Sequence, residues 1–338
     1  MGKNTKIGNI RAIAIILVVL GHSIIMYTNW GLIHTERSIP YIMYLKRFIN
    51  ILEMPVFMSV GGYVFYYSMK KKKKFTEFAV NKIQRVLIPF ILVGTLWVTP
   101  LRMFVHVKGW SNTFIGNVIN NIILMKSTGH LWYLVSLFLI FIVMYWVLKV
   151  GEHFQRQGLF DLLMIFGFLY ISMSAKDGYI LQSEYAPIQR FFYYLFWFYL
   201  GYLLNKYFEE QIGNQDIGVG LLFAVCFAMS FFIYSRYGNT ISYYAAAFSG
   251  VMSLYLLVPQ KTNRFLSLLE RDSYGLYLFH SPMVYLTFTW FTNRNPYAVV
   301  FINVFGLGLI SICMTEILRR TPFAFIIGET YKGRPRKA

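Results

Sequence analysis

Residues 11–28 read RAIAIILVVLGHSIIMYT, an apolar run that opens on a cation and carries one histidine. A helix needs about 20 mostly apolar residues to cross the hydrocarbon core of a bilayer. Similar runs recur along the chain, and the ten predicted spans are 11–28, 50–69, 86–105, 130–149, 159–175, 188–206, 217–234, 240–258, 273–291 and 297–317. The sequence therefore predicts an all-α integral membrane protein, a bundle of about ten transmembrane helices.

The composition excludes an ordinary soluble enzyme. Of the 338 residues, 57% are hydrophobic and only 14% are charged, and the mean hydropathy is +0.51. A soluble domain with this composition would expose large apolar patches. No interval between the spans could hold a soluble domain, so residues 1–338 are predicted to form a single membrane-embedded domain. Cys226 and Cys313 lie far apart within apolar runs, a spacing that predicts neither a disulfide nor a metal site.

The net charge of +18 has a topological explanation. With ten spans and a cytoplasmic N-terminus, 22 of the 32 lysines and arginines fall on the cytoplasmic side, which is the bias that the positive-inside rule describes. Both termini are therefore predicted to be cytoplasmic. The run Lys70–Lys74 is typical of a stop-transfer flank that also touches anionic lipid. A nucleic-acid partner is not expected.

Arg11 and His22 share one face of the first predicted span. Their separation of eleven residues brings them within about 20° of each other around a helix and about 16 Å apart along it. Such a helix would carry a phosphate-binding cation at the cytoplasmic edge and an imidazole deep in the membrane. The alternative is that Arg11 only flanks the span and His22 packs as a hydrogen-bonded residue.

Three further ionisable residues are candidates because such groups are costly in a bilayer and usually functional. Glu53, in the second span, is expected a few residues below the outer surface, where it could orient a histidine, bind a sugar hydroxyl or face water. Lys82 and Arg85 precede the third span, and their i, i+3 spacing places both cations on one side of a helix. That geometry suits phosphate groups, although a topology flank would look the same.

Two more histidines and several outer residues complete the set. His130 and Trp132 open the fourth span, and His280 lies in the ninth, just before Pro282. A proline inside a helix frees a backbone carbonyl, which is tolerated where the helix lines a cavity. Each histidine could be structural or functional. Arg102, His106 and Arg190 lie at outer ends of spans, where they either snorkel or line a groove for an anionic or sugar substrate.

Five motifs in this order resemble those of the membrane-bound acyltransferase-3 family. They are Arg11 with Ala14-Ile15 and Gly21-His22; Met54-Pro55-Val56-Phe57 with Gly62-Tyr63; the basic stretch from Lys82 to Pro89; His130-Leu131-Trp132-Tyr133-Leu134; and Tyr277-Leu278-Phe279-His280-Ser281-Pro282. The chain departs from the family's pattern at Gly61, where serine is frequent, at Lys82, where arginine is frequent, and at Glu53, where close relatives often have histidine.

The resemblance implies transfer of an acyl group, usually acetyl, from cytoplasmic acyl-CoA to a hydroxyl of an exported or cell-surface carbohydrate such as capsule or exopolysaccharide. It also implies a bacterial plasma-membrane location. Arg11, Lys82 and Arg85 would then hold the acyl-CoA phosphates, and His22 would act near the thioester, with Glu53 orienting it. His130, Trp132 and His280 would serve the acceptor or the structure.

Two points stay open at this stage. A histidine has an ordinary pKa of about 6.5, which leaves neutral imidazole available at cellular pH. His22 could therefore be a general base or a nucleophile that carries the acyl group. The other function compatible with these spans is a transporter for a polysaccharide or lipid-linked sugar. No tightly bound cofactor is expected, and the sequence does not indicate an oligomeric state.

Overall fold

The computed structural model describes residues 5–28, 39–179, 185–214 and 216–331, which form helices and short connections without any strand. Its α-helices are α1 (Thr5–Ser23), α2 (Pro40–Met69), α3 (Phe75–Lys82), α4 (Ile88–Val93), α5 (Thr99–Phe104), α6 (Phe114–Asn117), α7 (Trp132–Gly151), α8 (Gln157–Lys176), α9 (Ala186–Asn214), α10 (Ile217–Tyr237), α11 (Thr240–Leu257), α12 (Arg264–Trp290), α13 (Pro296–Phe301) and α14 (Gly308–Arg319). Four π-helical turns continue some of them, at Ile83–Leu87, Gly94–Val98, Val118–Ile123 and Ile302–Leu307.

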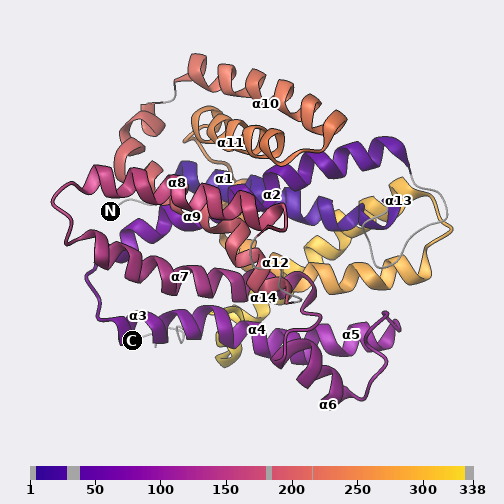
Figure 1. The fold of residues 1–338 in the computed structure, drawn as a ribbon. Coiled ribbons are helices and arrows are strands. Elements are labelled where there is room, and N and C mark those ends of the chain that lie inside the picture. The colour runs from indigo at the N-terminus through magenta and orange to yellow at the C-terminus, as the bar shows by residue number, and fades with distance from the viewer. Residues whose placement is uncertain (1–4, 29–38, 180–184, 215, 332–338) are drawn as a thin grey trace.

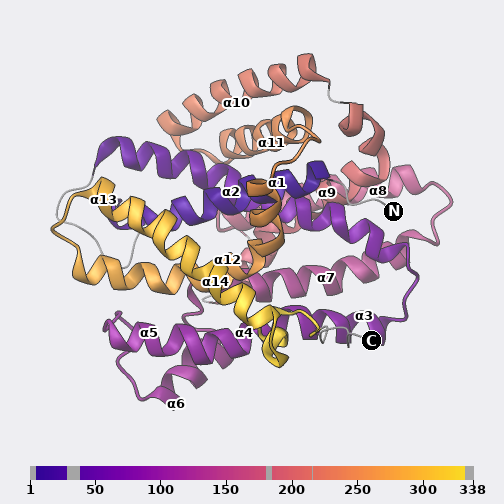
Figure 2. The same cartoon turned by 180° about the vertical axis from the view of Figure 1, so that it is seen from behind.

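Helix α1 runs through the middle of the bundle, packed between α2 and α12. Helices α10 and α11 lie side by side along one edge, and α5 and α6 lie at the opposite edge (Figures 1 and 2). Of α10 only Gly220 is buried, so nearly the whole helix presents apolar side chains outward. That exposure is the arrangement expected of a helix that faces lipid.

The predicted membrane class is confirmed. Eight helical runs among the described residues are long and apolar enough to cross a bilayer: Thr5–Ser23, Pro40–Met69, Phe75–Phe104, Gly129–Gly151, Gln157–Lys176, Ile217–Tyr237, Thr240–Leu257 and Pro296–Arg319. The other two predicted spans, 188–206 and 273–291, lie within α9 and α12. These helices are long enough but rich in tyrosine and other polar groups in place of aliphatic ones. The count of ten and the cytoplasmic termini therefore stay predictions.

Two helices begin earlier than predicted, and this changes where candidate residues lie along them. Helix α2 starts at Pro40 rather than residue 50, so Glu53 lies thirteen residues into a 30-residue helix. The expectation that Glu53 lies a few residues below the outer surface stays a prediction, now for a position well inside a long helix. The third span is helical from Phe75 rather than residue 86, so Lys82 and Arg85 lie within the helical run and not before it.

The start of α1 is anchored by side chains that donate to helix ends. Lys6 is buried, and its Nζ donates to the carbonyls of Ile212 and Leu256, at 2.6 and 3.3 Å. The Asn9 amide donates to the carbonyls of Pro259 and Lys261. The carbonyls of Ile212 and Leu256 belong to the last turns of α9 and α11, whereas Pro259 and Lys261 lie in the connection between α11 and α12. The bonds therefore fix α1 against two helix ends and one connection.

Helices α2 and α9 approach so closely that only glycine fits at two positions. A Cβ at Gly62 would overlap the backbone carbonyl of Phe198, and a Cβ at Gly201 would overlap that of Ser59. Small residues allow this kind of backbone approach between membrane helices. At Gly61, by contrast, a Cβ would meet the Phe198 ring at an ordinary 3.4 Å. The structure therefore has room for a small side chain at position 61 but none at position 62.

We predict that Gly62→Ala strongly destabilises the bundle, because the added methyl meets backbone, which cannot rotate away. The matched control is Gly61→Ser in the neighbouring turn. Overpacking a tight contact typically costs about 1–3 kcal/mol. Thermal unfolding of the purified full chain in detergent should show a lower Tm for Gly62→Ala and little change for Gly61→Ser. Equal Tm values for the two variants would contradict the close α2–α9 contact.

Candidate active site

Three histidines from three helical segments meet inside the bundle. The rings of His22 and His280 have their centres 5.0 Å apart, and His130 lies 6.4 Å from His22 and 6.3 Å from His280. His130 and His280 are buried, and His22 is half-buried. Sequence reasoning had singled out each of the three separately, and the fold brings them to one place.

The hydrogen bonds of these rings fix where their protons lie. His280 Nδ1 lies 2.5 Å from the Leu276 carbonyl oxygen, which can only accept, so Nδ1 carries the proton. The His280 Nε2 of a neutral ring is then an acceptor, and His22 Nδ1, at 2.9 Å, must donate to it. A neutral His22 therefore has its lone pair on Nε2. This is the arrangement of an oriented base, in which a second group sets the tautomer of the first.

Pro282 supplies the acceptor for the third histidine. Because proline has no N–H, the carbonyl of Leu278 lacks its usual helical partner. His130 Nε2 lies 3.2 Å from that carbonyl and donates to it. The His130 Nδ1 is left as a buried acceptor without a partner among the described residues. The carbonyl that the sequence predicted to be freed in α12 thus holds His130 in place, and Tyr277 donates back to the His130 carbonyl at 2.5 Å.

A cavity of about 530 Å³ opens beside the histidines. His22 and His130 line it together with Glu53 and Trp132, so four of the predicted site residues share one space. The rest of the wall is mainly aromatic: Tyr133, Tyr193, Tyr194, Trp197, Tyr234, Tyr243, Tyr244 and Tyr277. Aromatic faces with a few polar groups are typical of sites that bind small molecules, and they suit the apolar faces of sugar rings.

Glu53 forms an ion pair rather than a direct bond to His22. Its carboxylate lies 3.5 Å from Lys46 Nζ, and both side chains are largely buried. The two charged groups lie against Gly21, the residue before His22. A buried charge needs such a partner, since an unpaired one is costly. The structure therefore places Glu53 beside His22 but gives its carboxylate to Lys46.

Trp132 supports a cation of the same cavity wall. Its ring stacks on Tyr194 with centres 5.6 Å apart, and the guanidinium of Arg190 lies 5.1 Å from the Trp132 ring centre. Of the outer residues, Arg190 alone lines the cavity as expected. Arg102 is instead buried against Gly129, and His106 is exposed away from the cavity wall. Of the two alternatives for these residues, lining a groove therefore fits Arg190 in this cavity, whereas Arg102 and His106 are not part of its wall.

Arg11 lies at the other end of α1. Both Arg11 and His22 belong to this one continuous helix, as the spacing required, and the rise per residue separates them by about 16 Å. The Arg11 side chain is 33% exposed and has a loose ion pair, 3.9 Å, with Glu270 of α12. A half-exposed cation with one distant partner remains able to bind an anion.

Lys82 and Arg85 have different surroundings, although both belong to the third helical run. Lys82 is half-buried, with Nζ 3.7 Å from the centre of the Phe141 ring, whereas Arg85 is exposed. A π-helical turn at Ile83–Leu87 begins directly after Lys82 and contains Arg85, and it widens the helix, so three residues no longer complete nearly one turn. Tyr274 donates to the Arg85 carbonyl, four residues along α12 from the Glu270 that meets Arg11. One turn of α12 thus connects the Arg11 and Arg85 segments.

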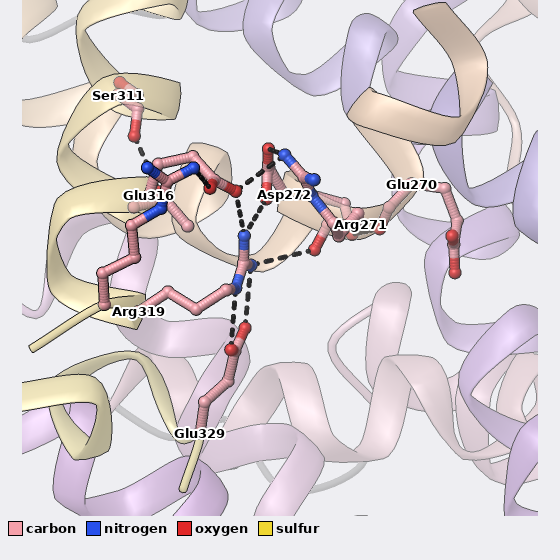
Figure 3. Close-up of polar contacts among 10 residues, drawn as sticks. Glu270, Arg271, Asp272, Ser311, Glu316, Arg319 and Glu329 are labelled. Atoms are coloured by element: carbon pink, nitrogen blue, oxygen red, sulfur yellow. Dashed lines mark hydrogen bonds and ion pairs between the residues drawn. The ribbon is translucent and has the colours of Figure 1, made fainter. Parts of the chain in front are cut away.

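Other cations near this turn of α12 are already neutralised. Arg319 of α14 pairs with Asp272 at 2.5 Å and with Glu329 at 2.8 Å, and Arg271 pairs with Glu316 at 2.7 Å (Figure 3). Figure 3 shows the Glu270 carboxylate directed away from this network. No carboxylate of the described residues lies within ion-pair distance of Lys82 or Arg85. The network joins α12 to α14, and it leaves Arg11, Lys82 and Arg85 as the available cations.

Sequence reasoning missed three features of the site. Lys46 was not a candidate, because the predicted second span began after it. Lys176, which also lines the cavity, was counted only as a charge at the end of a span. The tyrosines of α9 and α11 were not among the candidates either. The sequence did contain a signal for them: tyrosines lower the hydropathy of α9, and two of these tyrosines, Tyr193 and Tyr194, line the cavity.

A fold and site of this kind define a multi-pass membrane protein with an oriented base set inside the bundle. The chain belongs to the acyltransferase-3 family, because residues 4–316 match the family's acyltransferase domain. The earlier resemblance is confirmed, and the protein is a membrane-embedded acyltransferase. No curated protein and no solved structure gives a match.

The proton positions derived above can be measured. We predict that the ¹⁵N spectrum of the labelled protein shows neutral His22 protonated at Nδ1, because His280 accepts only that proton. His280→Ala should return His22 to the Nε2-protonated form that predominates in free histidine, whereas His153→Ala, at an exposed site, should not. A His22 signal that is Nε2-protonated in the unmodified protein would contradict the hydrogen-bond chain.

Proposed function

We propose that this acyltransferase moves an acyl group, acetyl in the first instance, from cytoplasmic acyl-CoA to a hydroxyl of an exported or cell-surface carbohydrate. The observation that carries the proposal is the chain from the Leu276 carbonyl through His280 to His22. It leaves a basic nitrogen at the wall of an aromatic cavity. The activity fits an enzyme of the plasma membrane of a bacterium that modifies capsule or exopolysaccharide.

In the direct mechanism His22 acts as a general base. The acceptor oxygen attacks the thioester carbonyl carbon while His22 Nε2 takes the hydroxyl proton. The tetrahedral intermediate collapses with cleavage of the carbon–sulfur bond, the sulfur takes the proton back from His22, and CoA leaves as the thiol. The hydrogen bond to His280 holds the imidazole ring in place through both proton transfers.

In the relay mechanism His22 Nε2 itself attacks the thioester carbonyl carbon, the carbon–sulfur bond breaks, and CoA leaves as the thiolate while the acyl group is held on the imidazolium. The acceptor oxygen then attacks the acyl carbon, the bond to Nε2 breaks, and the freed Nε2 takes the hydroxyl proton and returns it to solvent, from which the CoA thiolate is protonated. Both routes use the same lone pair and the same His280 contact. The relay is the route that allows donor and acceptor to occupy the protein one after the other.

The donor's phosphates would bind at the Arg11 end of α1. Arg11, Lys82 and Arg85 lie in segments joined by one turn of α12, and none is neutralised by a close carboxylate. Phosphate groups form strong charge-assisted bonds with such cations. The pantetheine arm would then extend along α1 toward His22. No tightly bound cofactor is needed for this chemistry.

The acceptor would occupy the aromatic cavity. Trp132 and the surrounding tyrosines offer flat apolar faces and hydroxyl groups, which together match the two faces of a sugar ring. The lone pair of His130 Nδ1 could accept a hydrogen bond from a sugar hydroxyl. The Glu53 carboxylate could accept a second such hydrogen bond while it stays paired with Lys46.

We predict that His22→Ala lowers carbohydrate acetylation by at least about 10²-fold, because general-base catalysis commonly contributes that much. O-acetyl content of the cell-surface polysaccharide, measured by NMR at matched protein levels, checks this, with His153→Ala as the control. Unchanged acetylation would refute the role of His22. Loss of the polymer itself, rather than of its acetyl groups, would indicate an exporter.

Donor binding has its own test. Arg11→Ala should raise the KM for acyl-CoA about 10-fold, because a charge-assisted phosphate contact contributes about 1.5–3 kcal/mol. The matched control is Arg264→Ala, which removes an exposed arginine at the start of another helix, α12. Acyl-CoA dependence that is the same in both variants would exclude Arg11 from the donor site.

A further inference from the structure

The cavity beside His22 carries an excess of positive charge. Lys46, Lys176 and Arg190 line it, and Glu53 is the one carboxylate among the described residues of its wall. Lys46 and Glu53 neutralise each other at 3.5 Å. Two cations, Lys176 and Arg190, therefore remain uncompensated.

Those two cations are held by aromatic rings. Lys176 Nζ lies 3.9 Å from the centre of the Tyr243 ring, and Arg190 lies 5.1 Å from Trp132 and 5.8 Å from Tyr193. A ring face holds a cation in position without neutralising its charge. No carboxylate of the described residues lies within ion-pair distance of either cation, and neighbouring Asp177 accepts a hydrogen bond from Thr240.

The positions of Lys176 and Arg190 in the bundle argue against the view that they only set the orientation of the helices in the membrane. Lys176 ends α8 and Arg190 belongs to the first turns of α9, at the end of the bundle that the charge bias predicts to be outside. The positive-inside rule disfavours cations there. Both are nevertheless directed to one cavity, and that cavity also holds the basic nitrogen of His22.

We propose that the acceptor is an anionic glycan, bound through carboxylate or phosphodiester groups by Lys176 and Arg190 while its hydroxyl lies at His22. This inference rests on the proposed function and specifies its acceptor. A neutral glycan would use the aromatic walls but bring no anionic group to either cation. An anionic one satisfies them and is oriented by them.

The test uses the purified full chain with labelled acetyl-CoA and three acceptor probes. These are a neutral malto-oligosaccharide, an oligogalacturonate and an oligo(glycerol phosphate). We expect acetylation of at least one anionic probe with a kcat/KM about 10-fold or more above that of the neutral probe, the factor expected for one charge-assisted contact. Added salt should reduce that preference.

Two variants locate the preference. Lys176→Gln and Arg190→Gln should each raise the KM for the anionic probe about 10-fold, with the acyl-CoA KM unchanged. Lys176→Arg and Arg190→Lys, which keep the charge, should retain most of the preference and show that the fold is intact. Lys108→Gln, which removes an exposed charge outside the cavity wall, is the matched control.

The outcomes separate this inference from the function on which it rests. Equal kcat/KM for neutral and anionic probes would overturn the anionic acceptor and leave the transferase intact. So would an effect on the acyl-CoA KM, which would assign the two cations to the donor phosphates, or an equal effect of Lys108→Gln. If no probe is acetylated above the level of His22→Ala, the proposed function itself fails.

Discussion

The hydrogen bond from His22 to His280 is the contact on which the site depends. It joins α1 to α12, and because the far side of His280 is fixed by the Leu276 carbonyl, it also fixes the tautomer of His22. The direction of both hydrogen bonds follows from the Leu276 carbonyl, because this backbone group can accept a hydrogen bond but cannot donate one. A helix carbonyl is rigid, so the protein sets the position of a mobile proton with a part of the chain that does not move.

Several other features make this contact possible. The anchoring of Lys6 and Asn9 holds the start of α1, and the close α2–α9 approach at Gly62 holds the neighbouring wall. The proline in α12 frees the carbonyl that binds His130. Buried polar groups in a bilayer need partners, since each unsatisfied group costs several kcal/mol. The buried side chains that hold α1 and the histidines are accordingly paired, and the one buried ring nitrogen of the three histidines without a partner among the described residues, His130 Nδ1, belongs to a residue of the cavity wall.

Much of the fold followed from the sequence, because apolar runs of sufficient length have few alternatives to a membrane helix. The helix starts did not follow, since α2 and the third run extend into polar residues such as Lys46 and Lys82 that a hydropathy pattern assigns to loops. The two spans that fell short in apolar content, in α9 and α12, line the site. These two helices have a lower hydropathy than an ideal span because they carry polar residues that line the site. The histidines were found singly, but their meeting depends on helix packing, which no local pattern encodes.

The distribution of charge along α1 constrains how two substrates can meet. Arg11 and His22 are separated by about 16 Å on one rigid helix, so a donor held at one end can reach the other only through an extended, narrow arm. The cations around the cavity belong to other helices, α2, α8 and α9. Donor and acceptor would therefore be recognised by different elements that share only His22. Such a division allows the acceptor walls to change their charge or shape while the donor end and the histidine relay stay the same.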